Sequence, residues 1–118
     1  MKYALLIHTD QADWVDLSEE EKGELRSQEM PKWIALFDEL GKADPNVSGY
    51  ELDEGATAKV VRVRDGERVV TDGPFAETKE VIGGVFLTTL PDLDEAIRLA
   101  SLIPSAQTGS IEVRPVAE

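Results

Sequence analysis

The sequence predicts an α+β fold in which two β-α-β units are separated by a β-hairpin. Short runs rich in β-branched and other apolar residues recur along the chain, and two longer segments repeat apolar residues every three or four positions. An Asp-Gly pair also joins two adjacent strand patterns. Two split units of this kind form an antiparallel, ferredoxin-like sheet with both helices on one face. We therefore expect the order βαββαβ with an inserted hairpin.

The first predicted strand, Lys2–Thr9, is apolar on both faces for most of its length. Leu5 and Ile7 face one side, whereas Leu6 faces the other, because successive side chains of a strand alternate. An antiparallel sheet covered by helices on one side only should instead alternate apolar and polar residues. We therefore expect the second face to be covered by the sheet of another copy of the chain.

A connection over residues 11–17 leads to the first long helix, which is predicted to begin at Ser18. Ser18 and Glu21 have the spacing of a capping box. The acidic residues 19–21 suit the positive end of the helix dipole, so we prefer this structural role to a metal-binding one.

Pro31 interrupts the same helix, and it predicts either a kink or the first turn of a second helix. Gly41 stands where a C-terminal cap is expected. The predicted buried stripe of this helix consists of Leu25, Met30, Trp33, Ile34, Phe37 and Leu40.

The hairpin is predicted in the middle of the chain, after a short edge strand over Gly49–Asp53. Its first strand is Ala58–Arg64, in which valines and arginines alternate, and its second strand is Glu67–Thr71. Asp65-Gly66 between them is a strong two-residue hairpin signal.

The last third of the chain predicts a strand over Val81–Leu90, a helix and a strand over Thr108–Arg114. Asp92 and Glu95 form a second capping-type pair at the start of the helix, and Pro104 is expected to end it. Its predicted buried stripe consists of Leu93, Ala96, Ile97, Ala100 and Ile103.

Composition narrows the classes of function. The 118 residues predict a single domain. Acidic residues outnumber basic ones by 24 to 12, which disfavours binding to nucleic acid or to anionic membranes. The chain has no cysteine and only one histidine, so we expect no metal site built on these residues within one chain, and no cofactor motif is apparent. Without a secretory signal or an apolar run long enough for a membrane span, the expected location is the cytoplasm.

One block carries a family resemblance. Asp72-Gly73-Pro74-Phe75-Ala76-Glu77-Thr78-Lys79-Glu80, followed by Gly83-Gly84, resembles the signature of the DGPF branch of the YCII-related family. Residues 1–7, 63–66, 94–96 and 111–116 also match, so the resemblance covers essentially the whole chain. It implies a ferredoxin-like domain that pairs into a dimeric α+β barrel.

The family also implies possible activities. YCII-related proteins are proposed to use a His–Asp pair in a cleft, and one branch is similar to dehydrochlorinases that act on chlorinated hydroxyquinols. The histidine of those relatives lies at the start of the first long helix, but residues 18–30 contain none here. The role would therefore fall to His8.

The candidate catalytic residues are accordingly His8, as a general base, and Asp72, as its partner. The candidate ligand-binding residues are Arg64, Lys79, Phe75 and Gly83, which would bind an anionic or phenolic molecule near a dimer seam. A half-buried histidine that only hydrogen-bonds a loop or packs at the seam, and arginines in ordinary surface ion pairs, are the alternatives.

Two functions remain open from the sequence. One is a lyase or dehydrochlorinase-like enzyme acting on a small molecule. The other is a non-catalytic binding or regulatory module, because some DGPF relatives are encoded beside, or fused to, sigma factors of the extracytoplasmic-function type.

Overall fold

The computed structural model describes residues 1–10, 12–73 and 80–118. Candidate residues Phe75 and Lys79 lie outside this range. Six strands are described: β1 (Lys2–Thr9), β2 (Ser48–Glu51), β3 (Lys59–Arg64), β4 (Glu67–Asp72), β5 (Val81–Thr89) and β6 (Ser110–Pro115). The α-helices described are α1 (Ala12–Val15), α2 (Glu19–Ala43) and α3 (Leu93–Ser101), with single 3₁₀ turns at Gly55–Thr57 and Pro104–Gln107.

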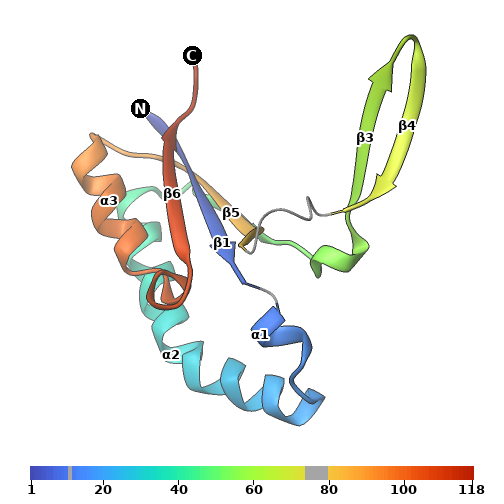
Figure 1. Ribbon diagram of the computed structural model, residues 1–118. Coiled ribbons are helices and arrows are strands. Elements are labelled where there is room, and N and C mark those ends of the chain that lie inside the picture. Colours follow the sequence, from blue (N-terminus) through green and yellow to red (C-terminus); the bar gives the residue numbers. More distant parts are fainter. Residues whose placement is uncertain (11, 74–79) are drawn as a thin grey trace.

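The main sheet is antiparallel, with strand order β2-β5-β1-β6. Helices α2 and α3 lie on one side of it (Figure 1). This arrangement is consistent with the ferredoxin-like α+β class, as the sequence predicted. Within the described residues no helix is both long enough and apolar enough to cross a membrane.

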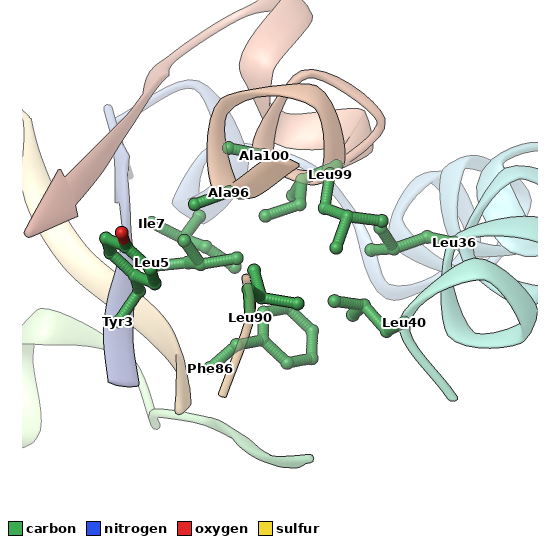
Figure 2. Packing of buried hydrophobic residues seen from close by; sticks show 11 residues of the cluster. Tyr3, Leu5, Ile7, Leu36, Leu40, Phe86, Leu90, Ala96, Leu99 and Ala100 are labelled. Carbon is green, nitrogen blue, oxygen red and sulfur yellow. The ribbon is translucent and has the colours of Figure 1, made fainter. Parts of the chain in front are cut away.

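The core lies between the main sheet and the two helices, and Figure 2 shows its packing. Alternate residues of β1, namely Tyr3, Leu5 and Ile7, are buried on the helix side. They belong to one cluster with Leu36 of α2 and Leu99 of α3. The predicted alternation of β1 is therefore confirmed, and the structure shows which of its two apolar faces meets the helices.

The predicted helix stripes were partly wrong. On α2 the buried residues are Leu36 and Leu40, whereas Leu25, Met30, Ile34 and Phe37 are exposed and Trp33 is only partly buried. On α3 Leu93 and Ile97 are exposed, while Leu99, absent from the predicted stripe, is fully buried. Both helices carry more apolar residues than one face of a four-stranded sheet can cover, so periodicity could not show which ones face it.

The start of α2 is confirmed. Ser18 is the N-cap, its hydroxyl accepts from the Glu21 amide, and the Glu21 carboxylate accepts from the Ser18 amide. Pro31 lies inside one continuous helix, and Figure 1 shows α2 changing direction along its length. A second helix that begins at Pro31 is therefore not what the structure shows.

The predicted C-terminal cap at Gly41 was wrong, because α2 continues to Ala43 and Asp44 caps it. The Asp44 carboxylate accepts from the Asn46 amide at 3.0 Å and the Thr89 amide at 2.9 Å, and from the Thr88 hydroxyl at 3.2 Å. The Thr89 bond is the main reason that the pKa of Asp44 is lowered. The Asp44 backbone amide caps the helix by donating to the Leu40 carbonyl at 2.8 Å, while its side chain joins this end of α2 to β5.

The hairpin of β3 and β4 forms a separate two-stranded sheet. Its turn residues, Asp65 and Gly66, have φ angles of 54° and 77°, the left-handed values of the predicted two-residue turn. At its base the Gly73 amide donates to the Ala58 carbonyl at 2.9 Å. In Figure 1 the hairpin stands apart from the helices, beyond the main sheet. The radius of gyration is 16.2 Å, against about 13.5 Å for a compact chain of this length.

Candidate functional site

His8 lies near the end of β1, on the face of the main sheet that points away from the helices. Its Nε2 atom is 3.1 Å from Oε1 of Glu112 on β6. The side chains are 24% and 35% exposed, so the contact is half-buried yet open to solutes. A carboxylate can only accept, so this hydrogen bond requires the imidazole proton on Nε2 and leaves Nδ1 as the basic nitrogen.

Glu112 also contacts a cation. Its other oxygen, Oε2, accepts from the Arg114 guanidinium. Ser110, Glu112 and Arg114 alternate along β6 and so share one face, on which the Ser110 hydroxyl donates to Glu80 at 2.9 Å. The carboxylate is thus fixed by a positive charge on one oxygen and orients a histidine with the other.

A bulge in β5 lies beside this end of β1. Ile7 pairs with Gly84, but the next residue, His8, pairs with Ile82, so Gly83 is the extra residue. The Gly83 carbonyl accepts from the Leu52 amide at 2.9 Å. Bulges of this kind are frequent beside binding sites because they change the direction of neighbouring side chains.

The surroundings of Gly84 show why this position of the Gly83-Gly84 pair has little room for a side chain. A Cβ atom there would lie 3.2 Å from the Tyr50 carbonyl oxygen and 3.2 Å from Cδ1 of Ile7. The atoms that approach Gly84 closely are therefore the backbone of β2 and a core side chain. Binding of a ligand at Gly83 stays a prediction.

The other candidate residues lie on the hairpin. Asp72 ends β4 and pairs across the hairpin with Lys59. The Arg64 guanidinium lies near the turn and donates to the Val63 carbonyl at 3.0 Å. The structure therefore brings His8 together with Glu112 and Asp72 together with Lys59, on two separate sheets.

A cavity of about 440 Å³ opens at the other end of the main sheet, beside Pro91 and Asp92. Three of the charged groups that line it bind one another or the backbone. Asp92 caps α3 by accepting from the Glu95 amide, and Arg98 pairs with Glu95 at 2.6 Å and Glu39 at 3.5 Å. The hydrogen bond from Arg98 is the main reason that the pKa of Glu95 is lowered.

Glu112 is the residue that sequence reasoning missed. The signal was present, because residues 110, 112 and 114 are polar while Ile111 and Val113 between them are apolar. Only the register between β1 and β6 shows that this polar face meets His8. Among residues 1–10, 12–73 and 80–118, no cluster of three or more His, Cys, Asp or Glu side chains could hold a metal ion.

Comparison with known proteins gives one family and one relative. The sequence model of the YCII-related domain matches residues 1–118. The chain is also 37% identical over 119 residues to the uncharacterized protein R00369 of Rhizobium meliloti (strain 1021), an alignment that covers 99% of this chain and 93% of the relative. These matches confirm the YCII-related resemblance, and the DGPF branch stays a prediction.

Proposed function

Since the chain belongs to the YCII-related domain family, we propose that it is a single-domain, cytoplasmic, homodimeric enzyme that moves a proton on a small molecule. The observation that supports this proposal best is the contact between Nε2 of His8 and Oε1 of Glu112. A histidine oriented by a carboxylate is the usual form of a general base. We also assign the chain to the DGPF branch, on the block that begins at Asp72.

The reaction we propose is a lyase-type elimination. The substrate reacts as its keto tautomer, in which the carbon that bears chlorine is tetrahedral. Nδ1 of His8 takes the proton of a remaining hydroxyl, the electrons of that O–H bond form a C=O bond, the adjacent ring double bond shifts, and chloride departs with the electron pair of the C–Cl bond. Glu112 stabilises the imidazolium that forms, and Arg114 holds Glu112 in place. Proton transfer by a positioned base of this kind contributes about 10²–10⁴-fold to a rate.

We further propose roles for the remaining candidates. Arg64 and Lys79 would attract an anionic or phenolic substrate, Phe75 would form an apolar wall, and the Gly83 segment would allow close approach. Asp72 would assist as a second acid or base. Because Asp72 and Arg64 lie on the hairpin rather than on the main sheet, these roles require assembly of the hairpin with the His8 surface.

The proposed dimer rests on the sheet face opposite the helices. Besides His8 this face carries Leu6, Val85, Leu87 and Tyr50, as the pairing register shows. Tyr50 is 68% exposed and Leu87 is 39% exposed. Leaving such a continuous apolar strip in water is unfavourable, and a second copy of the same sheet matches its shape.

A non-catalytic regulatory module, associated with sigma-factor control of transcription, is the second candidate. The observation that favours it is the exposed stripe of Met30, Ile34 and Phe37 on α2, which suits a protein partner. The two functions separate on whether the imidazole of His8 is required.

The first test observes the imidazole of His8 directly, because it is the only histidine in the sequence. Nitrogen-15 spectra of the imidazole should show the Nε2–H tautomer in the neutral state, and Glu112→Gln should reduce this preference. A matched control is Glu39→Gln, which removes a carboxylate that pairs with Arg98 instead. A wild-type spectrum dominated by the Nδ1–H form would contradict the proposed base.

The second test uses turnover of a chlorinated hydroxyquinol, followed by release of chloride. We expect His8→Gln to lower kcat/KM by about 10²–10⁴-fold, while Glu39→Gln leaves it unchanged. Retained activity in His8→Gln would rule out the base. Absence of chloride release by the wild-type protein would refute the dehydrochlorinase-like reaction itself.

A further inference from the structure

The β3–β4 hairpin, residues 59–72, is hereafter called the arm, and it leaves its own apolar residues uncovered. Val61, Val63 and Val70 are 59%, 63% and 52% exposed. Two-stranded hairpins are marginally stable in water unless an apolar face packs against something else. We therefore expect the apolar face of the arm to pack against another surface, one that the described residues of its own chain do not provide.

The uncovered valines form one face. Val61 pairs with Val70, and Val63 pairs with Arg68, so these four side chains point the same way. The opposite face is more sheltered at its base, because Val60 is half-buried and its Cγ2 atom lies 3.1 Å from where a Cβ of Gly73 would stand. The two faces of the arm therefore differ. The more exposed face carries Val61, Val63 and Val70, with the positive charge of Arg68 beside them.

The chain exposes more surface than a compact monomer of its mass. Its accessible surface is 8261 Å² for 13.0 kDa, whereas monomers of this mass expose about 6300 Å². The excess exceeds the roughly 800 Å² that each partner buries in an interface of standard size. There is therefore enough surface for a stable interface that includes both the arm and the uncovered sheet face.

The charge of the arm differs from that of the rest of the chain. The arm carries four basic and three acidic residues, whereas the other 104 residues carry eight basic and 21 acidic ones. A weakly basic strip is electrostatically complementary to an acidic body. The surface that best matches the arm in charge is therefore a second copy of this same chain.

We propose that the arm is a clasp between subunits, which packs its Val61, Val63 and Val70 face against a second copy, with Arg68 facing acidic groups of that copy. This inference rests on the homodimer proposed above. It adds that the sheet faces alone do not form the interface. In Figure 1 the arm stands beyond the main sheet, apart from the helices, which places it where a partner seated on the uncovered face would lie.

Hydrogen exchange at two protein concentrations tests the clasp. Amides of β3 and β4 should exchange slowly in the concentrated protein and at least about tenfold faster after dilution below the dimer dissociation constant, since only assembly covers them. Amides of buried β1 should change little. Equally fast exchange of the arm in monomer and dimer would overturn the clasp and leave the sheet-to-sheet dimer intact.

A variant pair gives the energetic test. Val63→Asp places an acid on the apolar face and should weaken dimerisation by at least about tenfold, as expected for a central contact residue. Ile97→Asp, on α3, changes a residue of similar exposure (51%) far along the chain from the arm, and it should leave the dimer unchanged. Sedimentation equilibrium measures both.

The outcomes distinguish the two proposals. Weak dimerisation in Val63→Asp with normal dimerisation in Ile97→Asp supports the clasp. Normal dimerisation in both variants overturns the clasp only. A wild-type chain that stays monomeric at high concentration overturns the clasp and the dimer together, whereas the His8 tautomer and turnover tests would still decide the base.

Discussion

The main body and the arm use similar strand residues in opposite ways. In β1 alternate apolar side chains are buried against two helices, whereas in β3 Val61 and Val63 stand in solvent. The strand patterns of the two regions are equally clear in the sequence, so pattern alone does not show what covers a strand. The comparison shows that the body covers the helix-facing residues of β1, while the arm leaves Val61 and Val63 exposed.

The largest expected effect separates the two regions directly. Leu5→Ala, at a fully buried position of β1, should lower the free energy of unfolding by about 2–5 kcal/mol at any protein concentration. Val61→Ala should change it by less than about 0.5 kcal/mol in dilute protein, and by more in concentrated protein. Urea unfolding at two protein concentrations measures both free energies. If the two substitutions lowered the free energy of unfolding equally in dilute protein, the proposed difference between body and arm would be wrong.

The body and the arm also differ in how they hold a carboxylate. Asp44 is buried and accepts three hydrogen bonds, whereas Asp72 is an exposed partner of Lys59. Asp44→Asn should cost about 1.5–3 kcal/mol at neutral pH, and Asp72→Asn should cost at most about 1 kcal/mol.

The cost at Asp44 should depend on pH in one direction. Folding lowers the pKa of Asp44 below its ordinary value of 3.8. The ionised form therefore stabilises the protein fully above that value, and this contribution is lost as pH falls through the lower, folded pKa. Unfolding curves should show the wild type and Asp44→Asn converging as pH falls below about 4. Convergence at higher pH would mean that Asp44 is not ionised in the fold.

The smallest effects come from two glycines with open space around them. A Cβ at Gly66 or at Gly23 would meet nothing within 4 Å, but only Gly66 has a left-handed φ, 77°. Gly66→Ala should therefore destabilise the arm by about 1 kcal/mol, whereas Gly23→Ala, inside α2, should stabilise by about 0.5–1 kcal/mol. Thermal unfolding should give shifts of opposite sign, and shifts of the same sign would contradict the turn geometry.

Local features were predictable from the sequence, because neighbouring residues determine them. The capping residues Ser18 and Asp92 and the Asp65-Gly66 turn depend on a few adjacent positions. The end of α2 was missed by two to three residues, because the Asp44 amide caps the helix on the Leu40 carbonyl. The partner of the Asp44 carboxylate was not predictable, since Thr89 of β5 lies 45 residues away. The burial of Leu36 rather than Phe37 likewise depends on how the helix is rotated against the sheet.

The candidate site was likewise predictable from the sequence only in part. His8 could be singled out from its chemistry, because it is the sole histidine. Its partner Glu112 lies 104 residues further along the chain, and only the pairing of β1 with β6 brings the two together. Asp72 was the natural expectation from the family block, yet its carboxylate pairs with Lys59.

Two contacts join the two strands at the base of the arm. The Gly73 amide donates a hydrogen bond to the Ala58 carbonyl, and Lys59 forms an ion pair with Asp72. These two contacts join the two ends of the hairpin at one place. Asp72, the first residue of the family block, is one of the residues that make them. Under the proposed clasp, a second copy that covers the arm would therefore contact an element that begins and ends beside the family block.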